Sequence, residues 1–564
     1  MFIPVTKKEL SDLGWEKLDI ILVTGDAYID SPFIGVSIIG KVLIDTGYRV
    51  GIIAQPDVSS SADIMRLGEP ELFWGVTSGS IDSMVANYTA SMKKRKSDDL
   101  TPGGRNEKRP DRAVIAYTNL IKKHFKNTKP VVLGGIEASL RRIPHYDQRD
   151  NKIRRSVLFD AKADYLVYGM GERTIIELAD ALKNKSDISD IKGLVYISKD
   201  PAISENDIIL PSFDEVKTDK ELFTEMFKTF YDNTDPVTAR RLLQKHDTRY
   251  LVLNKPQNSF SQAEIDAIYD LDYEYDAHPA EKSKGDIRAL ETIRFSITSH
   301  RGCYGECNFC SITIHQGRVI ESRSERSIIR EAKKLTKLPG FKGYILDVGG
   351  PSANMYGSIC KRMNKKGVCT DKDCLFPKQC KTLEVNHKKQ IDLLKKIAKI
   401  NGIKKVFVAS GLRHDMVIND QNYGTRYLEE LIKNHISGQL KIAPEHTEDN
   451  VLRLMRKTGI NDLIDFKGYF EKLNKKPDKK QFLTYYLIAA HPGCGMSEMK
   501  ELRKFAVSKL HLLPEQVQIF TPTPSTYSTL MYYTGKDPFT GEKIFVEMDI
   551  RKKEKQKAVI AKKK

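Results

Sequence analysis

Residues 293–323, IRFSITSHRGCYGECNFCSITIHQGRVIESR, form the stretch around which the rest of the chain is organised. Cys303, Cys307 and Cys310 stand there in a C-x3-C-x2-C array. Cysteine thiolates hold iron–sulfur clusters, and a cubane cluster normally takes four of them. Three clustered thiols therefore suggest one iron without a protein ligand, and an open position is typical of a catalytic metal site. The alternative is a structural zinc loop that a distant cysteine or histidine completes.

The length and the cysteine distribution limit the class of protein. With 564 residues, the chain is long enough for two to four domains that each bury a core. It contains no apolar run of 18 or more residues, and its first residues lack the apolar segment of a signal peptide. Seven of the eight cysteines lie between Cys303 and Cys380, unlike a disulfide framework spread over a secreted fold. We therefore expect a soluble, cytoplasmic protein with no membrane partner.

The net charge of +18 is partly local. Residues 551–564 hold eight Lys or Arg against one acid, and residues 93–112 form a second basic, Gly- and Pro-containing segment. Both segments are predicted to be disordered or solvated, with 547–564 as a basic tail. A solubilising role is the commoner one for such runs, and contact with nucleic acid is the alternative.

The first 210 residues predict a Rossmann-like doubly wound α/β domain. Residues 18–57 read as an apolar strand, a loop, an amphipathic helix and a second apolar strand. Residues 129–140 and 163–182 repeat the strand, glycine loop and helix. Residues 211–292 are interpreted as a connector with helices.

A strand-then-helix rhythm over residues 293–512 predicts a partial (β/α)6 barrel, followed by a small C-terminal module over 513–546. The expected strands are 294–298, 343–348, 404–409, 439–443, 482–489 and 515–520. Reactive groups of parallel barrels gather after the carboxyl ends of the strands. The residues found in those places are Cys303, Cys307, Cys310, Gly349, Gly350, Ser410, Arg413, His414, Glu445, His446 and His491. Ser410, Arg413 and Glu445 are candidates for binding a ribose or a carboxylate, and the three histidines for proton donation or metal ligation.

A second cysteine set follows the second expected strand. Cys360, Cys369, Cys374 and Cys380 lie within 21 residues, among lysines and glycines. In a cytosolic protein, such a set indicates a second metal site for zinc or an auxiliary iron–sulfur cluster. Free thiols are the alternative, and the spacing does not identify the metal.

The cysteine motif and its setting resemble the radical S-adenosylmethionine (SAM) enzymes. Together with GDAYIDSP, GGIEASLRR, DVGGPSANMYG, KIAPEHT and HPGCGM, it resembles the YgiQ-type radical SAM proteins to about Val546. The resemblance implies a 4Fe-4S cluster on the three cysteines, SAM on its fourth iron, and backbone contacts to SAM from Gly349 and Gly350. It further implies reductive cleavage of SAM to a 5′-deoxyadenosyl radical that abstracts hydrogen from a substrate, with an electron donor such as a flavodoxin or ferredoxin. Substrate identity does not follow from it, although the basic charge suggests RNA or protein modification.

The N-terminal domain also resembles the cobalamin-binding modules of radical SAM enzymes, in GGIEAS and YGMGERT. Those modules often ligate cobalt through the histidine of a D-x-H-x-x-G loop, whereas residues 30–35 read DSPFIG. We therefore expect no cobalamin, and a substrate-shaping or structural domain is the alternative. For the whole chain, the competing hypothesis is a non-catalytic metal–thiolate module that binds nucleic acid through its basic segments, with zinc rather than iron.

Overall fold

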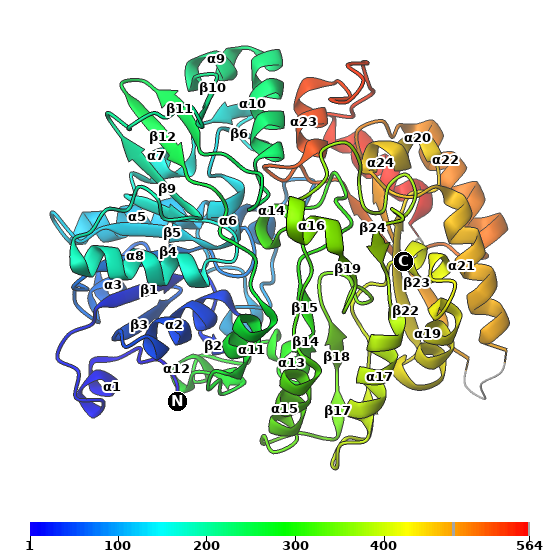
Figure 1. Cartoon of the computed structure of the whole chain (residues 1–564), viewed down its shortest axis with the longest axis horizontal. Helices are drawn as coiled ribbons and strands as arrows, with labels where there is room; N and C mark the ends of the chain where they lie inside the picture. Colours follow the sequence, from blue (N-terminus) through cyan, green and yellow to red (C-terminus); the bar gives the residue numbers. More distant parts are fainter. Residues whose placement is uncertain (476–479, 562–564) are drawn as a thin grey trace. The chain divides into compact units, whose positions relative to one another are not determined.

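The computed structural model describes residues 1–475 and 480–561 and divides the chain into two compact units (Figure 1). Unit 1 comprises Met1–Ser259 and Ala267–Arg294, and unit 2 comprises Phe260–Asp266 and Phe295–Lys564. Most of the expected connector, 211–292, therefore belongs to unit 1. No helix in the described part of the chain combines the length and apolar character that a membrane span requires.

Unit 1 is built on a nine-stranded sheet. Its strands, in spatial order, are β10 (Ile208–Leu210), β11 (Leu242–His246), β12 (Arg249–Leu253), β9 (Leu194–Ser198), β8 (Tyr165–Val167), β5 (Val131–Gly134), β4 (Phe73–Thr77), β1 (Ile20–Thr24) and β3 (Val50–Ala54). From β8 to β3 all neighbours are parallel, in the 2-1-3-4-5 order of flavodoxin-like sheets. This confirms the doubly wound architecture. From β1 the chain adds β3 on one side and then β4, β5 and β8 on the other, so the order of the strands switches between β1 and β4. Sheets of this type bind ligands at this switch point.

Alternation along the strands sends side chains to two helical layers. Leu22 and Ile52 pack in one hydrophobic cluster with residues of α2 and α8. Trp74 points to the other face, where its ring lies 5.1 Å from Phe125 at the end of α5. The helices of this part of the chain are α1 (Lys7–Asp12), α2 (Gly35–Asp45), α3 (Ala62–Met65), α4 (Ser83–Asn87), α5 (Ala113–His124), α6 (Gly135–Leu140), α7 (Val157–Ala161), α8 (Glu172–Asn184), α9 (Phe213–Thr218), α10 (Lys220–Asp232), α11 (Gln262–Asp270), α12 (Pro279–Lys282) and α13 (Leu290–Ile293). Short strands β2 (Ile29–Asp30) and β13 (Asp276–Ala277) pair, as do β6 (His145–Asp147) and β7 (Lys152–Arg154).

The basic segment 93–112 is ordered, which corrects the expectation of disorder. Ser97 and Arg105 pair across it, and Arg109 is 3% exposed. Arg109 forms ion pairs with Asp26 at 2.8 Å and Asp98 at 3.0 Å. The composition concealed this because a buried, paired arginine cannot be told from a solvated one by sequence alone.

Unit 2 contains six parallel strand positions in chain order, as the partial barrel requires. They are β14 (Ser296–Thr298), β17 (Tyr344–Ile345) with β18 (Asp347–Gly349), β21 (Lys405–Val406), β22 (Gln439–Glu445), β23 (Phe482–Ala489) and β24 (Gln516–Ile519). β14 pairs with β18, β17 with β21, and β22, β23 and β24 pair in series. A parallel bridge from Leu412 to Ile442 links the third position to the fourth. The α/β class and the six expected strands are thus confirmed.

Helices follow the strands of unit 2 and cover the outside of the series. They are α14 (Ile312–Gln316), α15 (Glu325–Leu335), α16 (Lys361–Lys366), α17 (His387–Ala398), α18 (His414–Asn419), α19 (Gly424–Glu430), α20 (Asp449–Met455), α21 (Ile460–Leu473), α22 (Met496–Phe505), α23 (Tyr527–Thr534) and α24 (Ile550–Ile560). Two antiparallel pairs interrupt the alternation: β15 (His300–Arg301) with β16 (Glu321–Ser322), and β19 (Ile359–Cys360) with β20 (Leu383–Glu384).

The expected disordered tail instead contains helix α24. The Asp549 side chain accepts a hydrogen bond from the Lys552 backbone N–H at 3.0 Å and caps its first turn. Lys553, Gln556 and Ile560 are buried at helical spacing. Because two of these three positions are polar, the buried face has no apolar signature in the sequence.

Candidate metal centre and cofactor site

The three cysteines of the central motif lie on the loop between β15 and α14, all partly exposed and free of disulfides. The Gly305 N–H donates to Cys303 Sγ at 3.3 Å, and the Cys310 N–H donates to the Cys307 carbonyl at 2.9 Å. A Cβ on Gly305 would lie 3.2 Å from Cys303 Sγ and 3.6 Å from Cys307 Sγ. The loop therefore wraps closely around its thiols, and soft thiolate donors on a short loop fit an iron–sulfur cluster.

Cys307 raises the pKa of the other two thiols of the loop. Burial raises the pKa of Cys303 to about 11, and the neighbouring Cys307 adds to the effect. Burial also raises the pKa of Cys310, with further increases from Cys307, Cys303 and Glu445. Thiolates held this close repel one another, so the cysteines favour the thiolate form only when a cation binds them. Thiolates are the species that ligate metals.

Arg413 lies beside this loop rather than in an open position. Its Nη1 is 3.5 Å from Cys307 Sγ, and its Nε donates to Asp415 at 2.9 Å. Burial would lower the pKa of Arg413, but the ion pair with Asp415 and the nearby thiols raise it. Arg413 is thus a fixed cation at Cys307. Asp415, which orients it, was not singled out in the sequence, although it stands two residues from Arg413.

Gly349 is the last residue of β18, and Gly350 begins the tightly packed turn after it. The Ser299 N–H donates to the Gly349 carbonyl at 2.7 Å. A Cβ on Gly350 would lie 2.6 Å from the His300 ring, and one on Gly349 would lie 2.9 Å from Ser410 Oγ. Only glycine fits so close an approach.

Ser410 is held by Asp347. The Ser410 hydroxyl donates to Asp347 Oδ2, and the Ala409 N–H donates to Oδ1 at 2.8 Å. Asp347 therefore connects the loop after β21 to the start of β18. It was missed, and its signal was an acidic residue inside the otherwise apolar segment YILDVGG.

Glu445 ends β22 in a strained conformation. Its φ is +71°, and the register of β22 against β23 shifts between Ile442 and Glu445. Burial raises its pKa, which Lys457 and Arg413 oppose. Lys457 is buried and donates to the Ala443 carbonyl at 2.6 Å. Strained buried residues cluster at functional sites, and the effect of Glu445 on Cys310 places it beside the cysteine loop.

The three candidate histidines are buried and neutral. Burial lowers the pKa of His414, His446 and His491 to about 3 in each case. His446 Nε2 lies 3.5 Å from Cys494 Sγ, and His491 Nε2 lies 2.7 Å from Ser528 Oγ. His446 and His491 thus each have a polar partner inside unit 2.

The second cysteine set lies on the β19–β20 pair and the loop between its strands. Cys360 and Cys374 are buried, while Cys369 and Cys380 are partly exposed. Across the described residues, no three Cys, His, Asp or Glu side chains lie close enough to hold one metal ion, and this holds for both cysteine sets.

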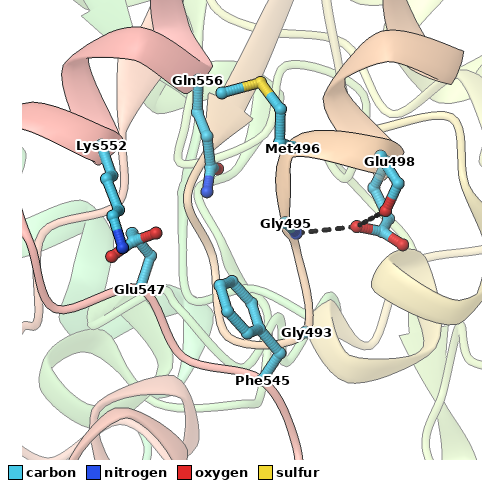
Figure 2. A pocket seen from close by; sticks show the side chains of 9 residues that line it. Gly493, Gly495, Met496, Glu498, Phe545, Glu547, Lys552 and Gln556 are labelled. Carbon is cyan, nitrogen blue, oxygen red and sulfur yellow. Dashed lines mark hydrogen bonds between the residues drawn. The ribbon is translucent and has the colours of Figure 1, made fainter.

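A pocket of about 530 Å³ lies in unit 2 between the start of α22 and the chain from 545 to 556 (Figure 2). In Figure 2 the side chains of Phe545 and Gln556 point toward each other across the pocket. Gln556 also connects it to the interior, since its Oε1 lies 3.9 Å from Cys494 Sγ. Sequence reasoning did not find this pocket, because residues of α24 contribute to its lining.

Comparisons with known proteins identify relatives over the full chain. The UPF0313 protein FN0734 of Fusobacterium nucleatum is 56% identical over 563 residues, which is 100% of this chain and 99% of the relative. A UPF0313 protein of Thermotoga neapolitana is 50% identical over 561 residues, covering 99% and 98%. Residues 2–296 match the Radical SAM N-terminal family, and residues 515–563 match a domain of unknown function, DUF3362.

Solved structures with the same fold are distant in sequence. The radical SAM methyltransferase TsrM from Kitasatospora setae, with cobalamin and a [4Fe-4S] cluster bound, gives a TM-score of 0.51 at 14% identity, covering 90% of this chain and 76% of TsrM. The cobalamin-dependent radical SAM enzyme OxsB with aqua-cobalamin bound gives 0.51 at 13%, covering 95% and 58%. These similarities establish the fold.

The fold comparison overturns the expectation that cobalamin is absent. Chains that share this fold hold cobalamin, so the lack of a histidine in residues 30–35 does not exclude it. The expectation was based on a single cobalt ligand, the histidine of the loop. It was wrong because a doubly wound sheet binds a ligand through many contacts at its edge.

The resemblance to radical SAM proteins is confirmed by the family match over more than half of the chain and by relatives that align from end to end. The chain therefore belongs to the UPF0313 proteins, within the radical SAM family.

Proposed function

We propose that the chain is a radical SAM enzyme that uses a 4Fe-4S cluster on Cys303, Cys307 and Cys310. The observation that carries the proposal is the convergence of three mutually interacting thiols at the carboxyl end of β14, with Arg413 and Glu445 beside them. Cys303, Cys307 and Cys310 would hold the cluster, which would supply the electron for reductive cleavage of SAM and so initiate hydrogen abstraction from the substrate.

The protein's own residues would bind and orient the reactants. The backbone of Gly349 and Gly350 would contact the amino group of SAM. Arg413 would hold a positive charge beside the cluster, since its Nη1 lies 3.5 Å from Cys307 Sγ. Glu445 is a candidate for the SAM ribose, and Ser410 for the same group once its hydrogen bond with Asp347 is exchanged.

The partners belong to the proposal as well. A flavodoxin or ferredoxin would deliver the electron. The net charge of +18 favours an anionic substrate, and RNA or protein modification is the class of reaction that we propose.

The test uses anaerobically reconstituted protein, with iron counted per chain and 5′-deoxyadenosine measured after addition of SAM and a strong reductant. We expect the Cys307→Ala variant to fold and to lose SAM cleavage completely. Cys494→Ala is the matched control, because Cys494 is a buried cysteine outside both sets, and it should keep cleavage. Zinc without iron, and no cleavage by the unmodified protein, would reject the enzyme and favour the metal–thiolate module.

Cobalamin is a candidate second cofactor for unit 1, supported by the fold shared with TsrM and OxsB. A cobalamin-dependent methyl transfer would then be the reaction class. Equilibrium dialysis with hydroxocobalamin tests this. Stoichiometric retention supports the candidate, and recovery of unbound cofactor rejects it.

A further inference from the structure

The pocket at the start of α22 lies within unit 2 and has the size of a small-molecule site. Its volume is about 530 Å³, and ligand pockets commonly measure about 300–1,000 Å³. One wall is the turn from Gly493 to Glu498, and the other is the chain from Phe545 to Gln556 (Figure 2). The lining shares no residue with the cluster and SAM sites proposed above. The pocket is therefore a candidate site of its own.

Phe545 supplies an exposed aromatic ring to this pocket. The residue is 53% exposed, although the chain around it is fixed. The Gly493 N–H donates to the Phe545 carbonyl at 2.7 Å, and a Cβ on Gly495 would lie 3.5 Å from the Phe545 ring. The ring thus lies against the turn that precedes α22 and keeps much of its surface open. An aromatic ring held in this way is suited to stack on a planar ligand.

Gln556 supplies hydrogen-bonding groups from the opposite wall. It is 1% exposed, and its amide points across the pocket toward Phe545 in Figure 2. Its Oε1 lies 3.9 Å from Cys494 Sγ, and a thiol is a weak donor. A glutamine amide offers both donors and an acceptor, and buried polar groups are normally hydrogen-bonded. The pocket therefore suits a ligand that has a flat face and a hydrogen-bonding edge.

The charges that line the pocket compensate one another. Glu498 accepts from the Gly495 N–H at 2.8 Å and lies in the first turn of α22, where a negative charge complements the helix dipole. The other two charged residues of the lining, Glu547 and Lys552, are of opposite sign. Burying a charge without a partner is costly, so the part of the ligand inside this pocket should be uncharged.

Helix α24 presents positive charge next to the pocket. It carries five Lys or Arg and one Glu. Arg551 and Lys555 are exposed and stand four residues apart, so they are neighbours on the helix surface. Lys552 and Gln556 have the same spacing one residue further along, and both line the pocket. The part of the ligand that lies outside the pocket should therefore be anionic.

We propose that this pocket binds a nucleotide. The uncharged base would stack on Phe545 and form hydrogen bonds with Gln556, and the phosphate would lie beside Arg551 and Lys555. A free nucleotide and a nucleotide within single-stranded RNA both offer this chemistry. The RNA source rests on the proposed modification of RNA, whereas binding itself requires neither the cluster nor SAM.

The experiment measures binding to the full chain by titration with AMP and with a labelled single-stranded RNA. We expect Phe545→Ala to weaken the binding of both about tenfold, because it removes the ring on which the base stacks. Phe482→Ala is the matched control, since Phe482 is 65% exposed at the start of β23 and should be neutral. Circular dichroism checks that both variants fold.

Two further variants distinguish the sources of the nucleotide. If RNA binds more tightly than AMP, and Arg551→Gln with Lys555→Gln removes that advantage, the ligand is an RNA strand. Equal affinities for RNA and AMP indicate a free nucleotide. Either result supports the pocket as a nucleotide site, provided that Phe545→Ala weakens binding.

Three results would overturn the proposal. The first is that neither AMP nor RNA binds to the unmodified protein. The second is that Phe545→Ala binds RNA normally while polyglutamate, which carries charge without bases, displaces the RNA; α24 would then attract acidic polymers in general. The third is that SAM displaces AMP, which would assign the pocket to the cofactor. Formation of 5′-deoxyadenosine, measured in parallel without RNA, reports on the proposed enzyme alone, so the two failures are distinguishable.

Discussion

The two units place polar groups at the same position of a parallel fold, the carboxyl ends of the strands, and treat them in opposite ways. In unit 1 the groups are complementary: Asp26 and Asp98 flank Arg109, and Asp82 pairs with Arg141. In unit 2 the groups at the end of β14 are alike: they are three thiols, and Cys307 raises the pKa of Cys303 and of Cys310.

The difference between paired opposite charges and clustered like groups distinguishes a structural ion pair from a candidate metal site. Complementary charges satisfy each other and stabilise the unit that contains them. Like groups held together store repulsion in their charged form, which a bound cation relieves. Both units have polar groups at strand ends, so the combination of residue types, and not the position, marks a candidate ligand site.

The largest expected effect tests the ion pairs of Arg109 at the strand ends of unit 1. Arg109→Met leaves two buried carboxylates without their cation, and we expect a loss of about 3–5 kcal/mol in the free energy of unfolding. Urea denaturation measures it. Arg105→Met, at an exposed position of the same segment, is the control and should change stability by less than about 0.5 kcal/mol. If Arg109→Met lowers the free energy of unfolding by less than about 1 kcal/mol, the ion pairs do not stabilise unit 1.

The second prediction tests the close approach of backbone in unit 2. Gly350→Ala places a Cβ 2.6 Å from the His300 ring and should displace the turn, lowering the rate of SAM cleavage about 10–100-fold. Gly411→Ala is matched to it, because its added Cβ meets no atom within 4 Å. The rate of 5′-deoxyadenosine formation is the readout. Equal rates for the two variants would refute a role for the Gly350 turn.

A third prediction contrasts two buried cations, Arg109 with its carboxylates and Lys553 of α24. Lys553 Nζ donates to the Tyr532 hydroxyl at 2.6 Å, and burial lowers its pKa to about 8. Between pH 8 and the ordinary lysine pKa of about 10.5, the unfolded chain binds this proton and the folded chain does not, so stability rises with pH. Relative to Lys553→Met, the wild-type protein should gain about 2 kcal/mol from about pH 7.5 to about pH 10.5. Denaturation curves across that range check it, and parallel profiles for the two proteins would count against the shift.

The smallest expected effect concerns the backbone strain at Glu445. Glu445→Gly relieves the φ of +71° and removes a buried carboxyl, so we expect up to about 1 kcal/mol of added stability together with a loss of SAM cleavage. Glu445→Gln keeps the strained backbone and should show no gain from its relief. Thermal denaturation measures the change in stability, and product formation on the same samples measures the change in SAM cleavage. Loss of both stability and activity would mean that the backbone holds Glu445 without strain.

Sequence patterns predicted what depends on local chemistry. The apolar strands of both units and the cysteine loop follow from periodicity and motif, because burial on a parallel sheet demands apolar runs. Asp347 was missed because the residue that it orients, Ser410, is distant in sequence, and Asp415 because sequence spacing does not show that its side chain pairs with Arg413. The buried Arg109 and helix α24 were missed because charged residues at helical or loop positions read as solvated until their partners are known.

The assignment of residues 260–266 to unit 2 has a consequence for taking the chain apart. The Phe260 N–H donates to Glu321 at 2.7 Å, and Asp266 accepts from the Ser324 N–H at 2.9 Å, where Ser324 caps α15. A fragment beginning at Phe295 would lose both contacts at the segment that follows the cysteine loop. Unit 2 is therefore not a continuous segment that a single cut releases, and exchanging it between relatives requires residues 260–266 as well.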